Sequence, residues 1–266
     1  MYSTAAGVPF VAVPPQHPRP DAPVVLAWHL LDAPRTEAAF AAALPLAGLD
    51  AWRIHLGLPL CGSRSPGTDA FMALGAQDAV RNVYGPITEQ AAAEFGPALA
   101  ALREQLGLGN GPLSLVGGSL GAAVALSVRA AGADVDAMVL VSPLLQLRPL
   151  VALMGREYGI DYAWDAGSAA VADRLDFVAR AAELGDVPVR LVVGADDSVP
   201  AVRAPAEALR DALPRAELVL VDGMGHALAE EPGVQPAPQL PAAAAVDALA
   251  VEWLERNSVA PALRSR

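Results

Sequence analysis

The sequence predicts an α/β protein in which helices flank a mostly parallel central sheet. Short apolar runs alternate with longer amphipathic stretches, and several of the apolar runs are continuous. Alternating strands and helices indicate βαβ units, and parallel strands that are buried on both faces read as continuous apolar runs. The chain has 266 residues, 54% of them hydrophobic. We therefore expect a single domain spanning residues 1–266.

The first half of the chain provides three expected strands and three expected helices. A proline-rich lead-in precedes a β-rich run at 24–28, and Pro34 introduces a helix at 35–46. Glycine and proline make 57–69 a loop, and Gly107 ends the helix expected before it. The expected strands are 24–28, 51–56 and 113–116, and the expected helices are 35–46, 87–106 and 120–131.

The second half continues the alternation after a longer insertion. Strands are expected at 138–141, 189–193 and 218–221, and helices at 169–184, 203–213 and 242–256. The segment between the first two of these strands is longer than one crossover helix requires. We therefore expect a small cap or lid at about 144–187.

Charge and composition exclude several function classes. The net charge is −11, which argues against a nucleic-acid or anionic-membrane surface. All 18 basic residues are arginine. Without lysine, Schiff-base chemistry, lysine-bound pyridoxal phosphate and a Walker A lysine are excluded. The sequence contains no H-E-x-x-H motif and no cysteine cluster, so no metal site and no cofactor are expected.

The expected location is the cytoplasm. With Cys61 as the single cysteine, no intrachain disulfide can form. No apolar run reaches the roughly 18 residues of a membrane span. Six prolines break the first 23 residues, which also lack a basic start, so we expect no secretory signal.

A G-x-S-x-G pentapeptide, Gly117-Gly118-Ser119-Leu120-Gly121, carries the strongest chemical signal. It follows an apolar run and precedes a helix-like stretch, which is the strand–turn–helix setting of a nucleophile elbow. Flanking glycines let strand and helix approach closely, and the serine hydroxyl stands at a helix N-terminus. The alternative is a glycine-rich turn with a helix-capping serine.

His226 is the only histidine that follows this serine in the chain. In this architecture the order is serine, acid, histidine. His226 lies in Asp222-Gly223-Met224-Gly225-His226, just past the strand expected at 218–221. A general base for Ser119 would have to stand there, at the carboxyl edge of the sheet.

The acid should follow the preceding strand, where Gly194-Ala195-Asp196-Asp197 stands. It would accept the Nδ1–H of His226 and stabilise the imidazolium. Either aspartate could instead cap the helix expected at 203–213.

Together these motifs resemble the α/β-hydrolase superfamily over about residues 24–256, in particular its small-cap esterase, dienelactone-hydrolase-like and prolyl-oligopeptidase-like members. The resemblance rests on the elbow, on Gly194–Asp197 as a G-x-x-D motif and on Gly223–His226 as a G-x-G-H motif. It implies an α/β-hydrolase fold with Ser119 as nucleophile, His226 as base and Asp197 as acid. Asp196 is the alternative acid because its spacing to Pro200 is common.

The oxyanion loop departs from the family pattern. The family usually has His-Gly after its first central strand, whereas this chain has His29-Leu30. The resemblance implies one oxyanion donor at the N–H of Leu120 and a second at Leu31 or Leu30. His29 is expected to stabilise the loop.

Aromatic and thioether side chains gather in the 57–85 loop region and in the 144–187 insertion. An apolar substrate pocket between them is expected, and ordinary packing is the alternative for each residue. The predicted substrate-binding residues are Phe71, Met72, Tyr162 and Trp164.

The sequence thus predicts a serine hydrolase, a carboxylesterase acting on small to medium carboxylic esters through an acyl-enzyme. The partner is a small-molecule ester, and a homodimer is the default assembly. The alternatives are a peptidase or amidase, a thioesterase, or a catalytically silent binding module of the same fold.

Overall fold

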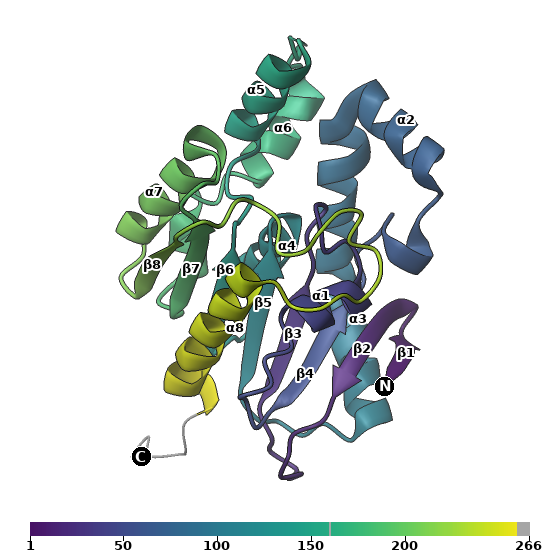
Figure 1. The fold of residues 1–266 in the computed structure, drawn as a ribbon, viewed down its shortest axis with the longest axis vertical. Coiled ribbons are helices and arrows are strands. Elements are labelled where there is room, and N and C mark those ends of the chain that lie inside the picture. Colours follow the sequence, from purple (N-terminus) through teal and green to yellow (C-terminus); the bar gives the residue numbers. More distant parts are fainter. Residues whose placement is uncertain (160, 260–266) are drawn as a thin grey trace.

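The computed structural model describes residues 1–159 and 161–259. Within them, one eight-stranded sheet has the order β1-β2-β4-β3-β5-β6-β7-β8 (Figure 1). The pairings from β4 to β8 are parallel, and β1 and β2 are antiparallel additions at one edge. The predicted mostly parallel sheet is therefore confirmed. The strands are β1 Tyr2–Ala5, β2 Val8–Val13, β3 Val24–Trp28, β4 Trp52–Leu56, β5 Leu113–Gly118, β6 Ala137–Val141, β7 Val189–Gly194 and β8 Ala216–Val221.

Helices cover both faces of this sheet (Figure 1). In the described part of the chain, none of them is long and apolar enough to span a membrane. The helices are α1 Glu37–Ala43, α2 Thr68–Ala79, α3 Gly85–Leu106, α4 Leu120–Ala130, α5 Leu147–Tyr158, α6 Ala166–Arg174, α7 Ala204–Ala212 and α8 Pro241–Leu254. Short turns at η1 Gly62–Arg64, η2 Val80–Tyr84, η3 Ala181–Leu184, η4 Val199–Arg203 and η5 Glu255–Val259 join or extend them.

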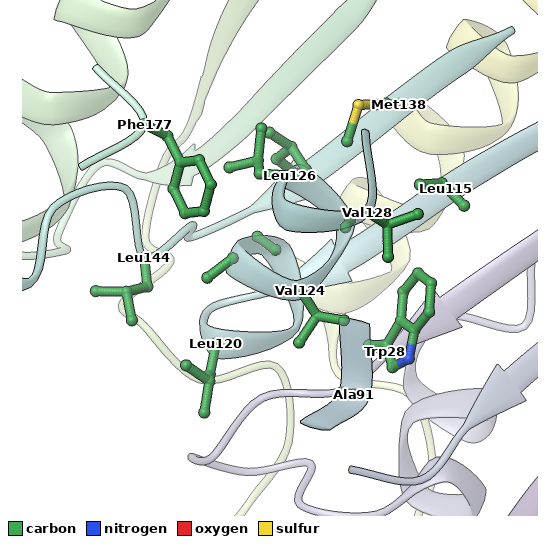
Figure 2. Packing of buried hydrophobic residues seen from close by; sticks show 14 of the residues in the cluster. Trp28, Ala91, Leu115, Leu120, Val124, Leu126, Val128, Met138, Leu144 and Phe177 are labelled. Atoms are coloured by element: carbon green, nitrogen blue, oxygen red, sulfur yellow. The ribbon is translucent and has the colours of Figure 1, made fainter. Parts of the chain in front are cut away.

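Two hydrophobic cores lie on opposite faces of the sheet. Helices α1 and α8 cover one face, where Phe40 and Trp253 are buried. Helices α3 and α4 cover the other (Figure 2). Most of α4 is buried, because it lies between the sheet and α3. A helix enclosed in this way is apolar over most of its surface, and its polar residues Ser127 and Arg129 lie among the positions that are not fully buried.

Several predicted boundaries are wrong, for identifiable reasons. The proline-rich lead-in holds the antiparallel hairpin β1–β2, whose partial alternation the prolines obscure. Residues from Thr68 form α2, which buries none of its side chains and so has no apolar periodicity to detect. The helix predicted at 169–184 ends at Arg174 and resumes only as the short turn η3.

The direction in which successive strands are added to the sheet reverses between β3 and β5. The neighbours of β5 are β3 and β6, and the chain places β4 on the far side of β3. Ligands of open α/β sheets bind beyond the carboxyl ends of strands at such a point. Helices α2, α5 and α6 lie at this same end of the molecule (Figure 1).

The start of α4 packs unusually close to β3. A Cβ atom on Gly121 would lie 2.3 Å from the backbone oxygen of Trp28 and 2.6 Å from that of His29. Backbone oxygens cannot move aside as a flexible side chain can, so only glycine allows this approach.

Replacing Gly121 with alanine should therefore lower the free energy of unfolding by about 2 kcal/mol or more, as forced overpacking does. Urea denaturation followed by circular dichroism measures the change. The matched control is Gly75→Ala in α2, where nothing lies within 4 Å of the added atom. That control should leave stability unchanged or raise it by up to about 1 kcal/mol. Equal stability of the two variants would contradict the close approach.

Candidate active site

Ser119 occupies a strained turn between β5 and α4. Its φ of 46° and ψ of −112° place a non-glycine residue in the left-handed half of backbone space. Such a conformation costs about 1–3 kcal/mol and persists only where neighbours hold it. Here the N–H of Ser119 donates to Val141 O at 2.9 Å, and its carbonyl accepts from Ala122 N at 3.0 Å and Leu144 N at 3.1 Å. The turn thus presents the hydroxyl beyond the carboxyl end of β5.

His226 joins the serine to an aspartate. It lies in the loop after β8, with Nε2 2.9 Å from Ser119 Oγ and Nδ1 2.9 Å from Asp197 Oδ2. With the proton on Nδ1, the ring donates to the carboxylate and its Nε2 accepts from the hydroxyl. These three predicted residues, far apart in the sequence, form one chain of hydrogen bonds.

Of the two candidate acids, the structure brings Asp197 to the histidine. Its carboxylate is buried, and its second oxygen accepts a hydrogen bond from Ser198 N at 2.7 Å. Asp196 is exposed and contacts the histidine loop through its backbone, where its N–H donates to Met224 O at 3.0 Å. Asp197 therefore has the geometry of a triad acid, and Asp196 does not.

The loops that carry the acid and the base are in close backbone contact. A Cβ on Gly194 would lie 2.1 Å from Met224 O and 2.5 Å from Gly225 O. Glycine at 194 therefore lets the histidine loop cross directly over the end of β7. The G-x-x-D pattern thus has a packing reason as well as a chemical one.

A second carboxylate, which the sequence reasoning did not assign, lies on the reacting side of His226. Asp32 Oδ2 is 3.6 Å from the histidine Nε2. Burial alone would lower the pKa of His226, but the hydrogen bond and charge of Asp197 and the charge of Asp32 raise it above its ordinary value of 6.5. The signal available in the sequence was the place of Asp32, just beyond the carboxyl end of β3.

The buried histidines His29 and His55 hold structure. Burial lowers the pKa of each to about 4, so both are neutral at pH 7. His29 Nδ1 donates to Leu30 O at 2.6 Å while its Nε2 accepts from Leu58 N at 3.2 Å, which ties the loop after β3 to the loop after β4. Its side chain thus connects the two loops, as a loop-stabilising residue would.

Cys61 offers no rival nucleophile. Burial raises the pKa of its thiol to about 12, so the reactive thiolate is absent at neutral pH.

The predicted oxyanion donors lie in different surroundings. Leu120 is the first residue of α4, so its backbone N–H has no partner within the helix. Leu31 lines the cavity that contains Ser119 and His226. The side chain of Leu30 is fully buried in the core against Gly118. The role of all three residues as oxyanion donors stays a prediction.

Two cavities meet at Leu31, which lines both. The smaller holds about 60 Å³ and is lined by the Ser119–His226 pair together with Leu31, Asp32, Tyr84, Pro143, Leu144, Leu150, Ala201 and Val202. The larger holds about 720 Å³, and its lining includes Tyr2, Arg35, Glu37, Cys61 and Glu231. The Ser119–His226 pair therefore lies in a small cavity beside a larger one.

The predicted substrate-binding residues divide into two pairs. Phe71 and Met72 line the larger cavity. Tyr162 and Trp164 line neither of these two cavities, and a role of any of the four residues in substrate binding stays a prediction. The Tyr162 hydroxyl donates to Asp78 at 2.7 Å, and its ring packs edge-on against Trp164.

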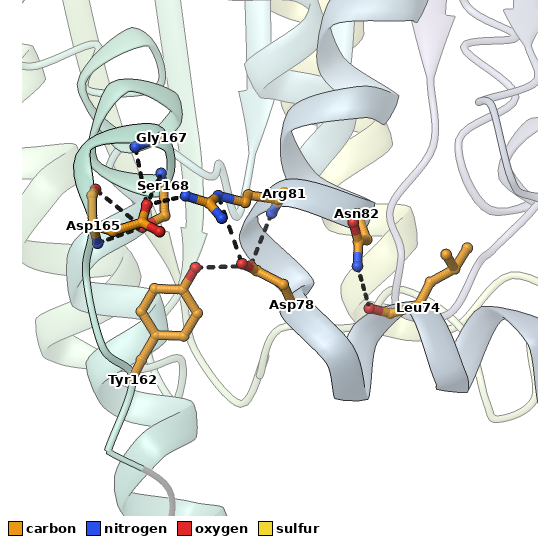
Figure 3. Close-up of polar contacts among 8 residues, drawn as sticks. All are labelled: Leu74, Asp78, Arg81, Asn82, Tyr162, Asp165, Gly167 and Ser168. Atoms are coloured by element: carbon orange, nitrogen blue, oxygen red, sulfur yellow. Dashed lines mark hydrogen bonds and ion pairs between the residues drawn. The ribbon is translucent and has the colours of Figure 1, made fainter.

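These contacts belong to a polar junction between the segment around η2 and the start of α6 (Figure 3). Arg81 bridges the two sides, because it pairs with Asp165 and lies 3.8 Å from Asp78. Asp165 in turn caps α6 through Gly167 N and Ser168 N. The Tyr162 hydroxyl therefore joins two segments of the chain.

Within residues 1–159 and 161–259, no three histidine, cysteine or acidic side chains are grouped so that they could hold a metal ion.

We compared the chain with known proteins by sequence and by structure. No family model matches the chain, and no curated protein matches it in sequence. Among solved structures it is similar to TT1662 from Thermus thermophilus, with 22% identity over 96% of each chain and a TM-score of 0.68.

Two further structures carry names that describe an activity. A cold-adapted esterase from an Arctic intertidal metagenomic library is 20% identical over 97% of this chain and 92% of its own, with a TM-score of 0.60. Dienelactone hydrolase from Anabaena variabilis is 18% identical over 94% of this chain and 92% of its own, with a TM-score of 0.56. Together with the sheet order and the turn at Ser119, these similarities identify the chain as having the α/β-hydrolase fold.

Proposed function

We propose that this protein is a serine hydrolase that cleaves carboxylic esters through an acyl-enzyme. The observation that carries the proposal is the hydrogen-bonded series of Ser119, His226 and Asp197, with both of its contacts at 2.9 Å. An activated nucleophile is recognised by such a series, in which a base contacts the hydroxyl and a third group orients the base. The names of the structural neighbours are consistent with this class of reaction.

In the first half of the reaction, Ser119 Oγ attacks the ester carbonyl while His226 Nε2 takes the hydroxyl proton. Asp197 holds the ring in the required tautomer and stabilises the imidazolium. The protonated histidine then donates its proton to the departing alcohol. The N–H groups of Leu120 and Leu31 are assigned to the developing oxyanion, with Leu30 as the alternative second donor.

In the second half, water enters and His226 removes its proton as it attacks the acyl carbonyl. The serine is regenerated and the acid departs. No cofactor takes part in either half. Thioesters and activated amides would follow the same course, because only the leaving group differs.

The insertion at about 144–187 is assigned the role of a cap over the small cavity. Leu144 and Leu150, which belong to it, form part of the wall beside Ser119. A cavity of about 60 Å³ accommodates roughly four to six water-sized groups. We therefore assign it to a short acyl chain and assign the larger cavity to the alcohol.

The Ser119→Ala variant should lose roughly 10³-fold or more of kcat/KM toward p-nitrophenyl butyrate, because no other group can form the acyl-enzyme. A fluorophosphonate probe should label the wild type and not this variant. The control is Ser127→Ala, a half-buried serine in α4 that lines neither cavity and should keep both activity and labelling. If the wild type neither turns over esters nor labels, the chain is a silent binding module of this fold.

The pH dependence should follow the raised pKa of His226. The base must be neutral to accept a proton, so kcat/KM should fall as pH drops through a pKa above 6.5. Removing the charge of Asp32 in Asp32→Asn lowers that pKa and should move the acid limb to lower pH. A pH–rate profile of both proteins measures this shift. An unmoved limb would mean that Asp32 does not act on the histidine charge.

The acyl assignment predicts a change in chain-length preference. Leu150→Ala removes part of the α5 wall of the small cavity and should move the best p-nitrophenyl ester to a longer acyl chain. The control is Leu153→Ala, a half-buried leucine in the same helix that lines neither cavity. A length profile that Leu150→Ala leaves unchanged would place the acyl chain elsewhere.

A further inference from the structure

Asp32 is a carboxylate that the proposed triad does not require. Asp197 already orients His226 through Nδ1, whereas Asp32 lies 3.6 Å from Nε2, on the side where the reaction takes place. Asp32 also lines the small cavity, and its side chain is 54% exposed, so it borders the space that a substrate enters.

A negative charge at this position has opposite effects on the two charges that form during acylation. It favours the imidazolium of His226, but it opposes the oxyanion that develops beside Ser119. A positively charged group on the substrate would neutralise Asp32 while the oxyanion forms.

In the described linings of the two cavities, no arginine is free to neutralise Asp32 in place of a positively charged substrate group. Asp32 and His226 are the titratable groups nearest the reaction, and the small cavity has no arginine in its described lining. The larger cavity has Arg35, but this side chain donates to both carboxylate oxygens of Glu231, each at 2.8 Å. That pairing leaves its charge already compensated.

Of the four arginines of the 144–187 insertion, Arg148, Arg174 and Arg180 pair with carboxylates, and none of the four lines either cavity. Arg148 pairs with Asp173 at 2.9 Å and stacks on Trp164, and Arg180 pairs with Glu183 at 2.6 Å. Neither lines a cavity. In the described linings, an anionic substrate would therefore meet Asp32 and Glu37, and a single arginine, Arg35, that already pairs with Glu231.

The lining of the larger cavity includes a second carboxylate, that of Glu37. Glu37 is 3% exposed, and its Oε1 accepts a hydrogen bond from the Tyr2 hydroxyl at 2.9 Å. Its Oε2 is buried and has no hydrogen-bond partner among the described residues. A buried carboxylate oxygen without a donor is costly, so a ligand that brings a positive charge or a donor would be favoured here.

The net charge of the whole chain acts in the same direction. At −11, the protein attracts cations over distances comparable to the Debye length, and a cleft lined by one sign of charge concentrates them further.

From these contacts we propose that the site selects esters whose alcohol carries a positively charged group such as an ammonium. Asp32 faces that group beside the scissile bond, and Glu37 provides the second carboxylate in the cavity that receives the alcohol. The proposal rests on the serine-hydrolase function above and adds its substrate class.

The test compares three butyrate esters that differ mainly in the charge of the alcohol. Choline butyrate is cationic, 3,3-dimethylbutyl butyrate has nearly the same shape without charge, and 2-sulfoethyl butyrate is anionic. In the wild type we expect kcat/KM to be highest for the cationic ester, by roughly 5- to 10-fold over the neutral one, and lowest for the anionic one. Raising the salt concentration should reduce the preference.

The variant Asp32→Asn should lower the cationic-to-neutral ratio toward one, and Glu37→Gln should lower it in part. The ratio cancels any change in the pKa of His226, because both esters use the same base. The control is Asp134→Asn, which removes an equal charge from an exposed position in the loop before β6 and should leave the ratio unchanged.

Two outcomes would overturn this inference without affecting the proposed function. One is turnover that depends on Ser119 but shows no preference for the cationic ester. The other is an Asp32→Asn variant that slows all three esters equally, which would assign Asp32 to the histidine alone. Failure of the wild type to turn over any of the three esters would instead count against the hydrolase function.

Discussion

The left-handed backbone at Ser119 is the constraint on which the rest of this site depends. A strand that passes directly into a helix through one residue at a φ of 46° must have neighbours that hold that residue. The hydrogen bonds from Ser119 N to Val141 O and from Leu144 N to Ser119 O bind the turn to β6 and to the start of the insertion. The close approach at Gly121 fixes α4 against β3. The position of the Ser119 hydroxyl therefore depends on contacts with β6, with the start of the insertion and with the end of β3.

The order of the strands then brings the partners to this turn. Because β5, β6, β7 and β8 are neighbouring parallel strands, the loops after β5, β7 and β8 all begin at the carboxyl edge of the sheet. The backbone contact between Gly194 and Met224 joins the loops of the acid and the base. His29 does the same for the loops after β3 and β4. A site assembled from five loops can thus be rigid without a disulfide or a metal.

Sequence reasoning succeeded where chemistry and packing require the same residues. The elbow, the G-x-x-D pattern and the lone downstream histidine could be placed because glycines and strand ends accompany them. The reasoning failed for α2, which buries no side chain, and for the β1–β2 hairpin, where prolines obscured the alternation. It also did not anticipate the contact of Tyr162 with Asp78, because composition does not show whether an aromatic ring faces a cavity or another segment of the chain.

Asp32 shows why charge in a site has to be judged by position. Asp32 follows Leu31 in the sequence, but the oxyanion-loop motif did not predict its role. That motif concerns backbone N–H groups and not the side chain of the next residue. In space its carboxylate is 3.6 Å from Nε2, while no arginine is found in the described lining of the small cavity. A protein site that carries one uncompensated charge beside its reacting atoms leaves the compensating charge to its ligand. The substrate's charge, rather than its size alone, would then determine how well the oxyanion is stabilised.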